Sequence, residues 1–354
     1  MKIRVLIVDD SFFMRKLIAE LLSEHPKIEV IDDASDGPEA VEKAVKLKPN
    51  VITMDYRMPG LDGAKATEKI LAKVEPPPAI IMLSAYTKEG AEETLNSLKA
   101  GAVDFIAKPS GELSLDINKI KQELVTKVIM AAQARVIRRT IKSVPKKVES
   151  RERQPVKRTS AAKVIVLGAS TGGPPIIEDI LVGLPANLNS SVLIVQHMPE
   201  HFTESFARRL AAMSNLQVRE AANNDVIKTS LAFVARGGYH MIIKKRTAGQ
   251  NIERLINLTQ AIPEWKGFRP SIDILMESVA ENFGREVVGV LLTGMGEDGR
   301  QGMRSIKEAR GYTIVQEPDT AVVDSMPKSV IKDGVADEVL PPDHIARRII
   351  ELVQ

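Results

Sequence analysis

The chain has no cysteine among its 354 residues, which excludes disulfide bonds, cysteine nucleophiles and thiolate metal sites. Serine, carboxylate and histidine side chains are left to carry any chemistry. The chain also lacks an apolar run near the roughly 20 residues that a membrane-spanning helix requires. Its apolar opening is interrupted by Asp9 and Asp10, and no small-residue cleavage site of a signal peptide follows. We therefore expect a cytoplasmic protein with no direct membrane insertion.

No charge of one sign dominates the parts of the chain that have folding patterns. Residues 1–141 hold 21 basic and 21 acidic side chains, and residues 161–354 hold 21 basic and 23 acidic ones. The basic excess lies in 142–160, with seven basic residues against two acidic ones. Nucleic-acid-binding domains concentrate Lys and Arg on their folded surface, so we expect no nucleic-acid partner. The basic segment has the composition of a solvated linker, and docking onto an acidic partner is the alternative.

The length predicts two domains, because an ordinary domain has about 100–200 residues. Hydrophobic residues make up 44% of the chain and charged residues 27%, which is typical of a globular protein. We divide the chain into a first domain at 1–120, a helical and basic linker at 121–160, and a second domain at 161–354.

The first domain alternates strand and helix patterns. Apolar runs of strand length occur at 3–8, 28–31, 51–54, 79–83 and 103–107, and helical patterns occur at 12–22, 37–46, 63–74, 88–99 and 112–139. This order predicts right-handed βαβ units and a doubly wound, five-stranded parallel sheet of the α/β class. In such sheets, binding groups gather at the carboxyl ends of the strands.

Polar side chains follow four of these predicted strands, namely Asp9 and Asp10, Asp55, Ser84, and Lys108. Three converging carboxylates repel one another unless a hard cation lies among them, and their oxygen atoms suit Mg²⁺. Lys108 and the Ser84 hydroxyl can then hold the oxygens of a phosphoryl group. We therefore predict Mg²⁺ ligands at Asp9, Asp10 and Asp55, with Asp55 as phosphoryl acceptor. The alternative is that each residue only caps a helix or ends a strand.

The first domain resembles the receiver domains of two-component response regulators. The resemblance rests on Val-Asp-Asp-Ser at 8–11, Met-Asp-Tyr-Arg-Met-Pro-Gly-Leu-Asp-Gly at 54–63, Ser-Ala at 84–85 and Phe-Ile-Ala-Lys-Pro at 105–109. It implies phosphorylation of Asp55 by a histidine kinase. It also implies that Phe105 is an aromatic switch residue acting with Ser84 and Lys108, although the bare sequence fits ordinary core at Phe105.

The second domain begins with a strand pattern at 163–167, a glycine-rich turn at 168–173 and a helical pattern at 174–181. The turn fits neither G-x-G-x-x-G nor G-x-x-x-x-G-K-[ST], so both nucleotide-binding fingerprints fail. It does fit G-x-S-x-G, a nucleophile elbow that would expose the hydroxyl of Ser170. Because a serine in such a turn is often only structural, this interpretation needs a base and an orienting acid.

Two later strand ends supply those groups. The predicted strand at 192–196 leads into His197, and the predicted strand at 287–292 leads into a glycine-rich loop that contains Asp298. Three functional types at three strand ends favour a Ser–His–Asp hydrolase of Ser170, His197 and Asp298. Their order along the chain differs from the Ser, Asp, His order of α/β-hydrolases, so that family matches poorly.

Other features of the second domain leave alternatives open. His197 to His201 fits the zinc-binding string H-x-x-E-H, but Pro199 breaks the helix that such a site needs, so His201 is expected to start a helix. His240 either lines the cleft or closes a turn. We expect a larger, mainly parallel sheet flanked by helices, with short antiparallel strands between 217 and 258.

The second domain resembles the catalytic domain of CheB-type chemotaxis methylesterases. The resemblance rests on Gly-Ala-Ser-Thr-Gly-Gly-Pro at 168–174, Val-Gln-His-Met-Pro at 195–199, Arg-Gly-Gly-Tyr-His-Met at 236–241 and Leu-Thr-Gly-Met-Gly-Glu-Asp-Gly at 292–299. The family often has Pro-Gly where this chain has Arg236-Gly237, which leaves the role of that loop open.

The resemblance implies hydrolysis of glutamyl methyl esters on methyl-accepting chemoreceptors to glutamate and methanol, with glutamine deamidation as a related activity. The backbone N–H of Thr171, which follows the nucleophile, is a candidate oxyanion donor, and the resemblance adds that of Met295. Hydrolysis needs no cofactor, and Mg²⁺ serves only receiver phosphorylation. Family regulation implies that the unphosphorylated receiver covers the catalytic cleft. A DNA-binding output domain and a non-catalytic scaffold with a structural Ser170 are the alternatives.

Overall fold

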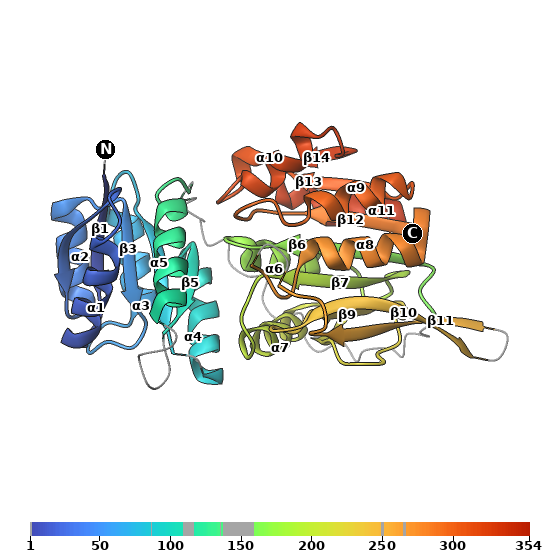
Figure 1. Cartoon of the computed structure of the whole chain (residues 1–354), viewed down its shortest axis with the longest axis horizontal. Coiled ribbons are helices and arrows are strands. Elements are labelled where there is room, and N and C mark those ends of the chain that lie inside the picture. Colours follow the sequence, from blue (N-terminus) through green and yellow to red (C-terminus); the bar gives the residue numbers. More distant parts are fainter. Residues whose placement is uncertain are drawn as a thin grey trace. The chain divides into compact units, whose positions relative to one another are not determined.

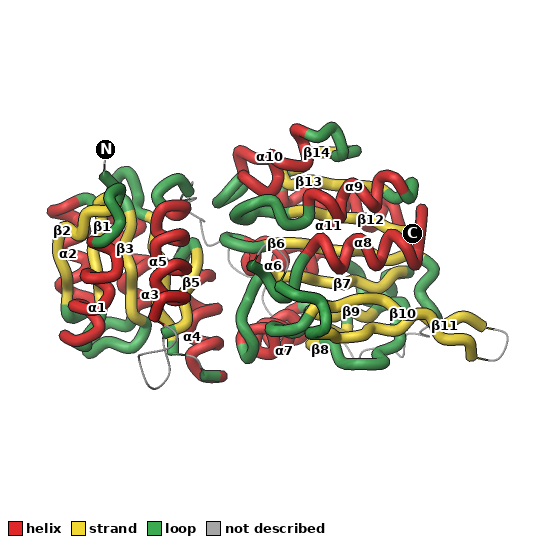
Figure 2. Tube along the Cα trace, viewed as in Figure 1, coloured by secondary structure: helices red, strands yellow, loops and turns green. Residues whose placement is uncertain are grey.

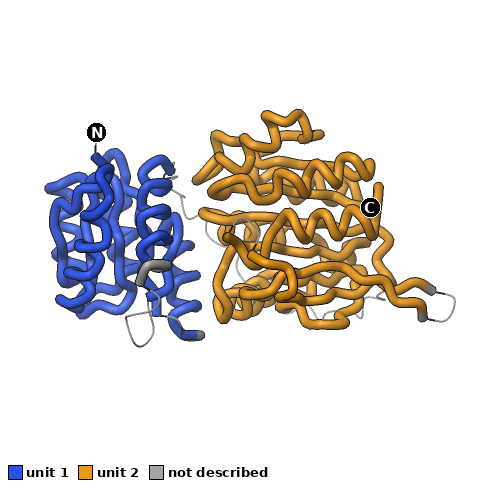
Figure 3. The backbone as a smooth tube through the Cα atoms, viewed as in Figure 1, with its two compact units in different colours: residues 1–140 blue, residues 141–354 orange. Residues whose placement is uncertain are grey.

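The computed structural model describes residues 2–85, 87–108, 117–134, 136, 159–248, 251–264 and 267–354. The chain forms two compact units, residues 1–140 and 141–354, shown in different colours in Figure 3. Most of the predicted basic linker, at 137–158, lies outside the described residues. In the described part of the chain, no helix has the length and apolar character needed to cross a membrane.

The first unit is the predicted five-stranded α/β domain (Figure 1). Its elements are β1 (Ile3–Val8), α1 (Phe12–Ser23), β2 (Ile28–Ala34), α2 (Gly37–Leu47), β3 (Val51–Asp55), α3 (Gly63–Lys73), β4 (Ala79–Ser84), α4 (Lys88–Lys99), β5 (Asp104–Ala107) and α5 (Ile117–Ala131). All strand pairs are parallel, in the order β2-β1-β3-β4-β5. The strand order reverses between β1 and β3, which is where such sheets bind ligands.

A polar N-cap residue precedes four helices of this unit, α1 to α4. The side chains of Ser11, Asp36, Asp62 and Thr87 each accept a hydrogen bond from a backbone N–H in the first turn of the following helix. These residue types satisfy N–H groups that have no partner within the helix. Three of these four helices begin soon after the preceding strand, whereas a longer loop at 56–62 joins β3 to α3.

The second unit contains a seven-stranded sheet and a separate hairpin. Its elements are β6 (Lys163–Ala169), α6 (Gly173–Gly183), β7 (Ser190–Gln196), α7 (Phe202–Met213), β8 (Gln217–Glu220), β9 (Leu231–Val234), β10 (His240–Ala248), β11 (Asn251–Thr259), α8 (Ile272–Phe283), η1 (Gly284–Glu286), β12 (Val287–Leu291), α9 (Arg300–Glu308), β13 (Tyr312–Gln316), η2 (Pro318–Thr320), α10 (Ser325–Lys332), β14 (Glu338–Leu340) and α11 (Pro342–Val353). The sheet has the order β14-β13-β12-β6-β7-β9-β8, and all its pairs are parallel.

The expectation of short antiparallel strands between 217 and 258 is wrong in part. β8 and β9 are short but pair in parallel and extend the large sheet, whereas β10 and β11 form a longer antiparallel hairpin (Figure 2). Two short strands separated by a polar loop favour a hairpin in sequence. Here the connection at 221–230 runs back alongside β11, where Ile227 donates its N–H to the carbonyl of Arg254. This contact between distant segments allows the second strand to start at the same end as the first.

The middle of the large sheet is formed by β12, β6 and β7, whose residues are almost all fully buried. Ala169 at the end of β6 pairs with Gln196 at the end of β7, and Gly168 pairs with Leu291 at the end of β12. The loops that follow these three strands therefore leave the sheet at the same edge. This register places Ser170, His197 and the loop that carries Asp298 at one edge of the sheet, although no hydrogen bond joins the Ser170 hydroxyl to the His197 ring in the described part of the chain.

Candidate active site

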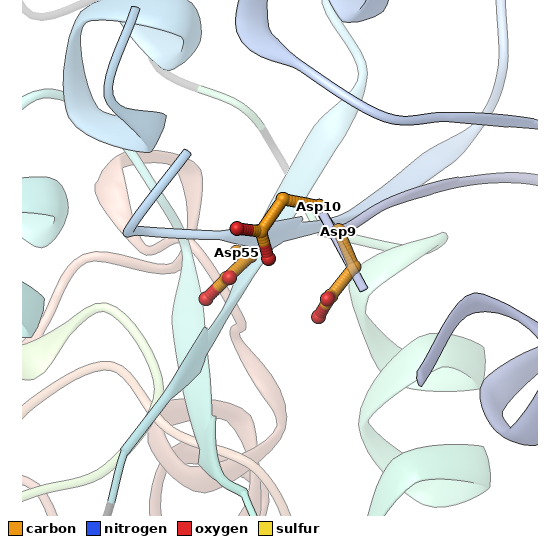
Figure 4. A group of neighbouring side chains, drawn as sticks. All are labelled: Asp9, Asp10 and Asp55. Carbon is orange, nitrogen blue, oxygen red and sulfur yellow. The ribbon is translucent and has the colours of Figure 1, made fainter. Parts of the chain in front are cut away.

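The predicted metal ligands of the first unit lie together. Asp9 and Asp10 follow β1 and Asp55 ends β3, and one carboxylate oxygen of each residue lies within 4.8 Å of those of the other two (Figure 4). The ammonium of Lys108 lies 2.8 Å from Asp9 Oδ2 and 2.9 Å from Asp55 Oδ1. The predicted grouping of three carboxylates and one lysine is therefore present at the carboxyl edge of this sheet.

For both Asp55 and Lys108, the effect of burial on the pKa is opposed by the opposite charge of the other residue. Burial raises the pKa of Asp55, and the neighbouring charge of Asp9 adds to the rise, while Lys108 opposes it. Burial alone would lower the pKa of Lys108, but the charges and hydrogen bonds of Asp55 and Asp9 raise it above its ordinary value. Lys108 thus remains a cation that offsets part of the carboxylate charge.

The residues present fit a hard cation. The three side chains offer only oxygen atoms, which Mg²⁺ prefers. Asp9 Oδ2 is buried, and within the described residues the Lys108 ammonium at 2.8 Å is its one close polar neighbour. A bound cation would satisfy this oxygen and reduce the repulsion among the carboxylates.

The remaining switch candidates have contacts of their own. The Ser84 hydroxyl donates to the carbonyl of Gly90 at 2.9 Å, so in this structure it does not point to Asp55 as a donor. Phe105 is buried, and the ammonium of Lys127 lies 5.2 Å from its ring centroid and 3.1 Å from Asp104 Oδ1. Lys127 was not predicted from the sequence, because only the packing of α5 against β5 places it over this ring.

In the second unit, backbone hydrogen bonds join the three strand ends around Ser170. Ser170 donates its N–H to the carbonyl of Thr293 at 3.0 Å, and His197 donates its N–H to the carbonyl of Ala169 at 3.1 Å. The side-chain amide of Gln196 donates to the carbonyl of Ser170 at 2.9 Å and to that of His197 at 3.3 Å. Ser170 and His197 are thus fixed on adjacent strand ends.

The loop after β12 passes directly against Ser170. A Cβ atom on Gly294 would lie 2.8 Å from the Cβ of Ser170, so only glycine permits this approach without a shift. Gly294 and Gly296 donate their N–H groups to Val323 and Ser325, whereas the Met295 N–H has no partner in the described part of the chain. The Met295 N–H therefore remains available on the loop whose Gly294 passes against Ser170.

His197 and Asp298 form a buried pair. His197 Nε2 lies 2.8 Å from Asp298 Oδ2, and Asp298 is fully buried. Burial alone would raise the pKa of Asp298, but the hydrogen bond and charge of His197, with backbone donors, lower it below its ordinary value. Because the carboxylate is ionised and can only accept, the imidazole carries its proton on Nε2.

The start of α8 holds the Asp298 carboxylate. Oδ1 accepts hydrogen bonds from the Ser271 hydroxyl at 2.8 Å and the Asp273 N–H at 3.0 Å, and Oδ2 accepts one from the Ile272 N–H at 2.7 Å. In return, Asp273 Oδ1 accepts the N–H groups of Gly299 and Gly302 at the start of α9, both at 2.8 Å. Asp298 thus accepts N–H groups at the start of α8, which contains Asp273, and Asp273 accepts N–H groups at the start of α9, which follows Asp298. The helix dipole favours a negative charge at both places.

The free side of the His197 ring is Nδ1, which is buried and has no hydrogen-bond partner among the described residues. The ring of Phe268 stacks on the imidazole, with the centroids 3.9 Å apart and the planes 7° from parallel. Sequence reasoning missed Phe268, because nothing in the pattern links it to His197. Its position three residues before Ser271, the cap of α8, is the only available signal.

The other histidine predictions have clear outcomes. His201 is the N-cap residue of α7, which confirms that it starts a helix, and residues 197–201 are not helical. The two histidines of the H-x-x-E-H string therefore do not share a helix face. His240 begins β10 and is fully buried, with ring contacts to Pro263 and Ser271.

Comparisons with known proteins agree with both units. Residues 165–349 match the family model of the CheB methylesterase, and residues 5–120 match that of the response regulator receiver domain. The crystal structure of the Thermotoga maritima CheB methylesterase catalytic domain is similar at a TM-score of 0.51 and 38% identity, covering 54% of this chain and 98% of that domain.

Full-length relatives show the same combination of units. A protein-glutamate methylesterase/protein-glutamine glutaminase of Methanococcus maripaludis is 42% identical over 366 residues, covering 100% of this chain and 98% of the relative. One of Carboxydothermus hydrogenoformans is 44% identical over 357 residues, covering 100% and 99%. The chain therefore belongs to the CheB methylesterase family, with a response regulator receiver domain ahead of the methylesterase domain.

Proposed function

We propose that the protein hydrolyses glutamyl methyl esters on chemoreceptors to glutamate and methanol, deamidates receptor glutamines, and is activated by phosphorylation of Asp55. Its family membership makes it a methylesterase, and its relatives carry the names of both activities. The observation that carries the proposed mechanism is the His197–Asp298 pair at 2.8 Å, whose unpartnered Nδ1 lies on the strand end adjacent to Ser170.

In this mechanism, the Ser170 hydroxyl attacks the ester carbonyl while His197 Nδ1 takes its proton. Asp298 stabilises the imidazolium that forms and keeps the ring in one orientation. The N–H groups of Thr171 and Met295 stabilise the charge on the carbonyl oxygen. His197 then gives the proton to the departing methanol, or to ammonia in the amide reaction. Water hydrolyses the acyl-enzyme by the same path in reverse, which restores Ser170.

In this proposal, the receiver domain regulates the hydrolytic activity of the second domain. A bound Mg²⁺ would neutralise charge during phosphoryl transfer, and Asp9, Asp10 and Asp55 would hold it. Asp55 accepts the phosphoryl group from a histidine kinase, and the Lys108 ammonium, already between Asp9 and Asp55, binds a phosphoryl oxygen. The added charge alters the receiver face and exposes the catalytic site. Neither domain requires a nucleic acid or a membrane span for this cycle.

The test is hydrolysis of methyl-esterified receptor by wild type and Ser170→Ala, with methanol release as the measurement. We expect the variant to lose about four to six decades of kcat, as other serine hydrolases do when the nucleophile is removed. Ser305→Ala is the matched control, because that hydroxyl donates only to its own helix at Gln301. Activity in Ser170→Ala near that of wild type would rule out this mechanism.

A titration with duplex DNA over a range of salt concentrations tests the alternative of a DNA-binding regulator. Specific binding would show nanomolar affinity and a steep salt dependence. We expect neither.

A further inference from the structure

A second imidazole is buried behind the His197–Asp298 pair. His240 is fully buried at the start of β10. Its Nε2 lies 3.0 Å from the carbonyl oxygen of Pro263, and its Nδ1 lies 3.3 Å from the backbone nitrogen of Ser271. The proposed reaction steps do not use this ring.

These two contacts fix the protonation of the ring. The Pro263 carbonyl can only accept, so Nε2 carries a proton, and the Ser271 N–H can only donate, so Nδ1 carries none. His240 is therefore a neutral imidazole in a single tautomer. In agreement, burial lowers the pKa of His240, and the charge of Arg269 acts in the same direction. A buried imidazole with both nitrogens in use holds its two partners at fixed positions.

One of those partners leads directly to the catalytic acid. Ser271 gives its N–H to His240 and its hydroxyl to Asp298 Oδ1, at 2.8 Å. The next two residues give their N–H groups to the same carboxylate. The position of Ser271 therefore sets three of the four hydrogen bonds that Asp298 receives. A shift of the Ser271 peptide would turn Asp298 and, with it, the imidazole of His197.

We propose that His240 is a positioning residue of the catalytic triad, which acts on His197 through Ser271 and Asp298. The inference rests on the proposed Ser–His–Asp mechanism. It assigns the decisive role to one ring nitrogen, Nδ1, because only that atom contacts Ser271. The contact of Nε2 with Pro263 serves to keep the ring in place.

Two isosteric substitutions separate the two ring nitrogens. In His240→Asn the amide oxygen can take the place of Nδ1 and accept from Ser271, but nothing reaches Pro263. In His240→Gln the amide nitrogen can take the place of Nε2 and donate to Pro263, but the acceptor for Ser271 is lost. His240→Ala removes both contacts. His344→Ala, on an exposed histidine of α11, is the matched control.

The experiment measures kcat, KM and the melting temperature of the full-length variants with methyl-esterified receptor. We expect His240→Gln and His240→Ala to lose kcat by about tenfold to a hundredfold, as displaced catalytic groups do. We expect His240→Asn to stay within about threefold of wild type, because it keeps the acceptor. KM should stay unchanged in all of them, because the substrate does not contact His240.

A ¹H NMR measurement reports directly on the hydrogen bond between His197 and Asp298. The proton between His197 Nε2 and Asp298 is expected to give a downfield ¹H resonance, absent in Asp298→Asn. It should persist in His240→Asn and broaden or move upfield in His240→Gln. This readout requires only the folded protein and no substrate.

The results for the His240 variants and for Ser170→Ala test two different proposals, the role of His240 and the proposed mechanism. Equal kcat and equal resonances in the Asn and Gln variants, or losses that merely follow the melting temperature, would overturn the role of His240 and leave the proposed function intact. Hydrolysis by Ser170→Ala at a rate near that of wild type would instead overturn the proposed Ser–His–Asp mechanism on which the inference rests. In that case the resonance still decides whether His240 holds the His197–Asp298 pair.

Discussion

At the scale of single residues, the orientation of His197 is set from three sides. Asp298 accepts from Nε2, Phe268 covers one face of the ring, and the backbone of β6 holds the residue's own N–H. Nδ1 has no hydrogen-bond partner among the described residues. In the proposed mechanism the base is thus oriented before any substrate binds, which lowers the reorganisation that the reaction requires.

The stacked ring of Phe268 leads to a prediction of its own. We expect Phe268→Ala to lower kcat by about threefold to tenfold, because an aromatic pair contributes about 0.5–1.5 kcal/mol beyond its buried area. The imidazole would then be exposed on one face and less firmly oriented. Steady-state kinetics check this, with Phe268→Tyr as the control that keeps the ring. If the alanine variant matched wild type while remaining folded, stacking would have no part in orienting His197.

At the scale of elements, one side chain at the start of α2, that of Glu39, makes the stability of the fold depend on pH. Glu39 accepts the N–H of Ser35 at 2.7 Å and its hydroxyl at 2.9 Å, and it lies 2.9 Å from the ammonium of Lys43. The hydrogen bond from the Ser35 backbone, followed by that from Lys43, lowers the pKa of Glu39 from 4.5 to about 2. The charged form is therefore favoured in the folded helix.

The sign of the resulting pH dependence follows from this shift. The folded pKa lies below the unfolded one, so Glu39 adds stability that is fully present above pH 4.5 and is lost as the pH falls towards 2. We expect Glu39→Gln to make the unfolding free energy of the receiver less sensitive to pH across this window. Urea unfolding at several pH values, followed by circular dichroism, measures it. Glu42→Gln, an exposed change on the same helix, should leave the wild-type dependence intact.

The sequence predicted elements better than it predicted their contacts. Residues that end strands, such as Asp55 and His197, were predictable because a parallel sheet brings all carboxyl ends to one edge. The parallel pairing of β8 and β9 was not, because it depends on backbone bonds between residues 221–230 and β11. The same holds for Phe268 over His197, since contacts between distant segments leave no local pattern. His240 was singled out, but its two partners were not.

At the scale of the whole molecule, each unit holds its own set of reactive groups. Among the described residues, the proposed phosphoryl-accepting site draws on residues 9–108, and the proposed hydrolytic site draws on residues 170–298. In the proposed function, control of the second site by the first therefore does not rest on shared catalytic residues. This separation allows each function to be removed alone.

Substitution of the phosphoryl acceptor tests this separation. We expect Asp55→Asn to hydrolyse methyl-esterified receptor at the basal rate of the unphosphorylated wild type, but to show no increase with a small-molecule phosphodonor. Methanol release with and without phosphodonor and Mg²⁺ is the measurement. Glu29→Gln, an exposed change on β2, should respond as wild type does. An unchanged response in Asp55→Asn would place the activating phosphorylation elsewhere.

The hydrogen bonds that Asp298 accepts at the start of α8, and those that Asp273 accepts at the start of α9, have a consequence for redesign of this enzyme. Because Asp298 holds the start of α8 and Asp273, in the first turn of α8, holds the start of α9, the proposed acid of the triad is also part of the architecture. Ser170 sits on a separate turn with no such duty. Laboratory evolution towards a new nucleophile therefore has freedom on the serine side, whereas any replacement of Asp298 must also rebuild the start of α8.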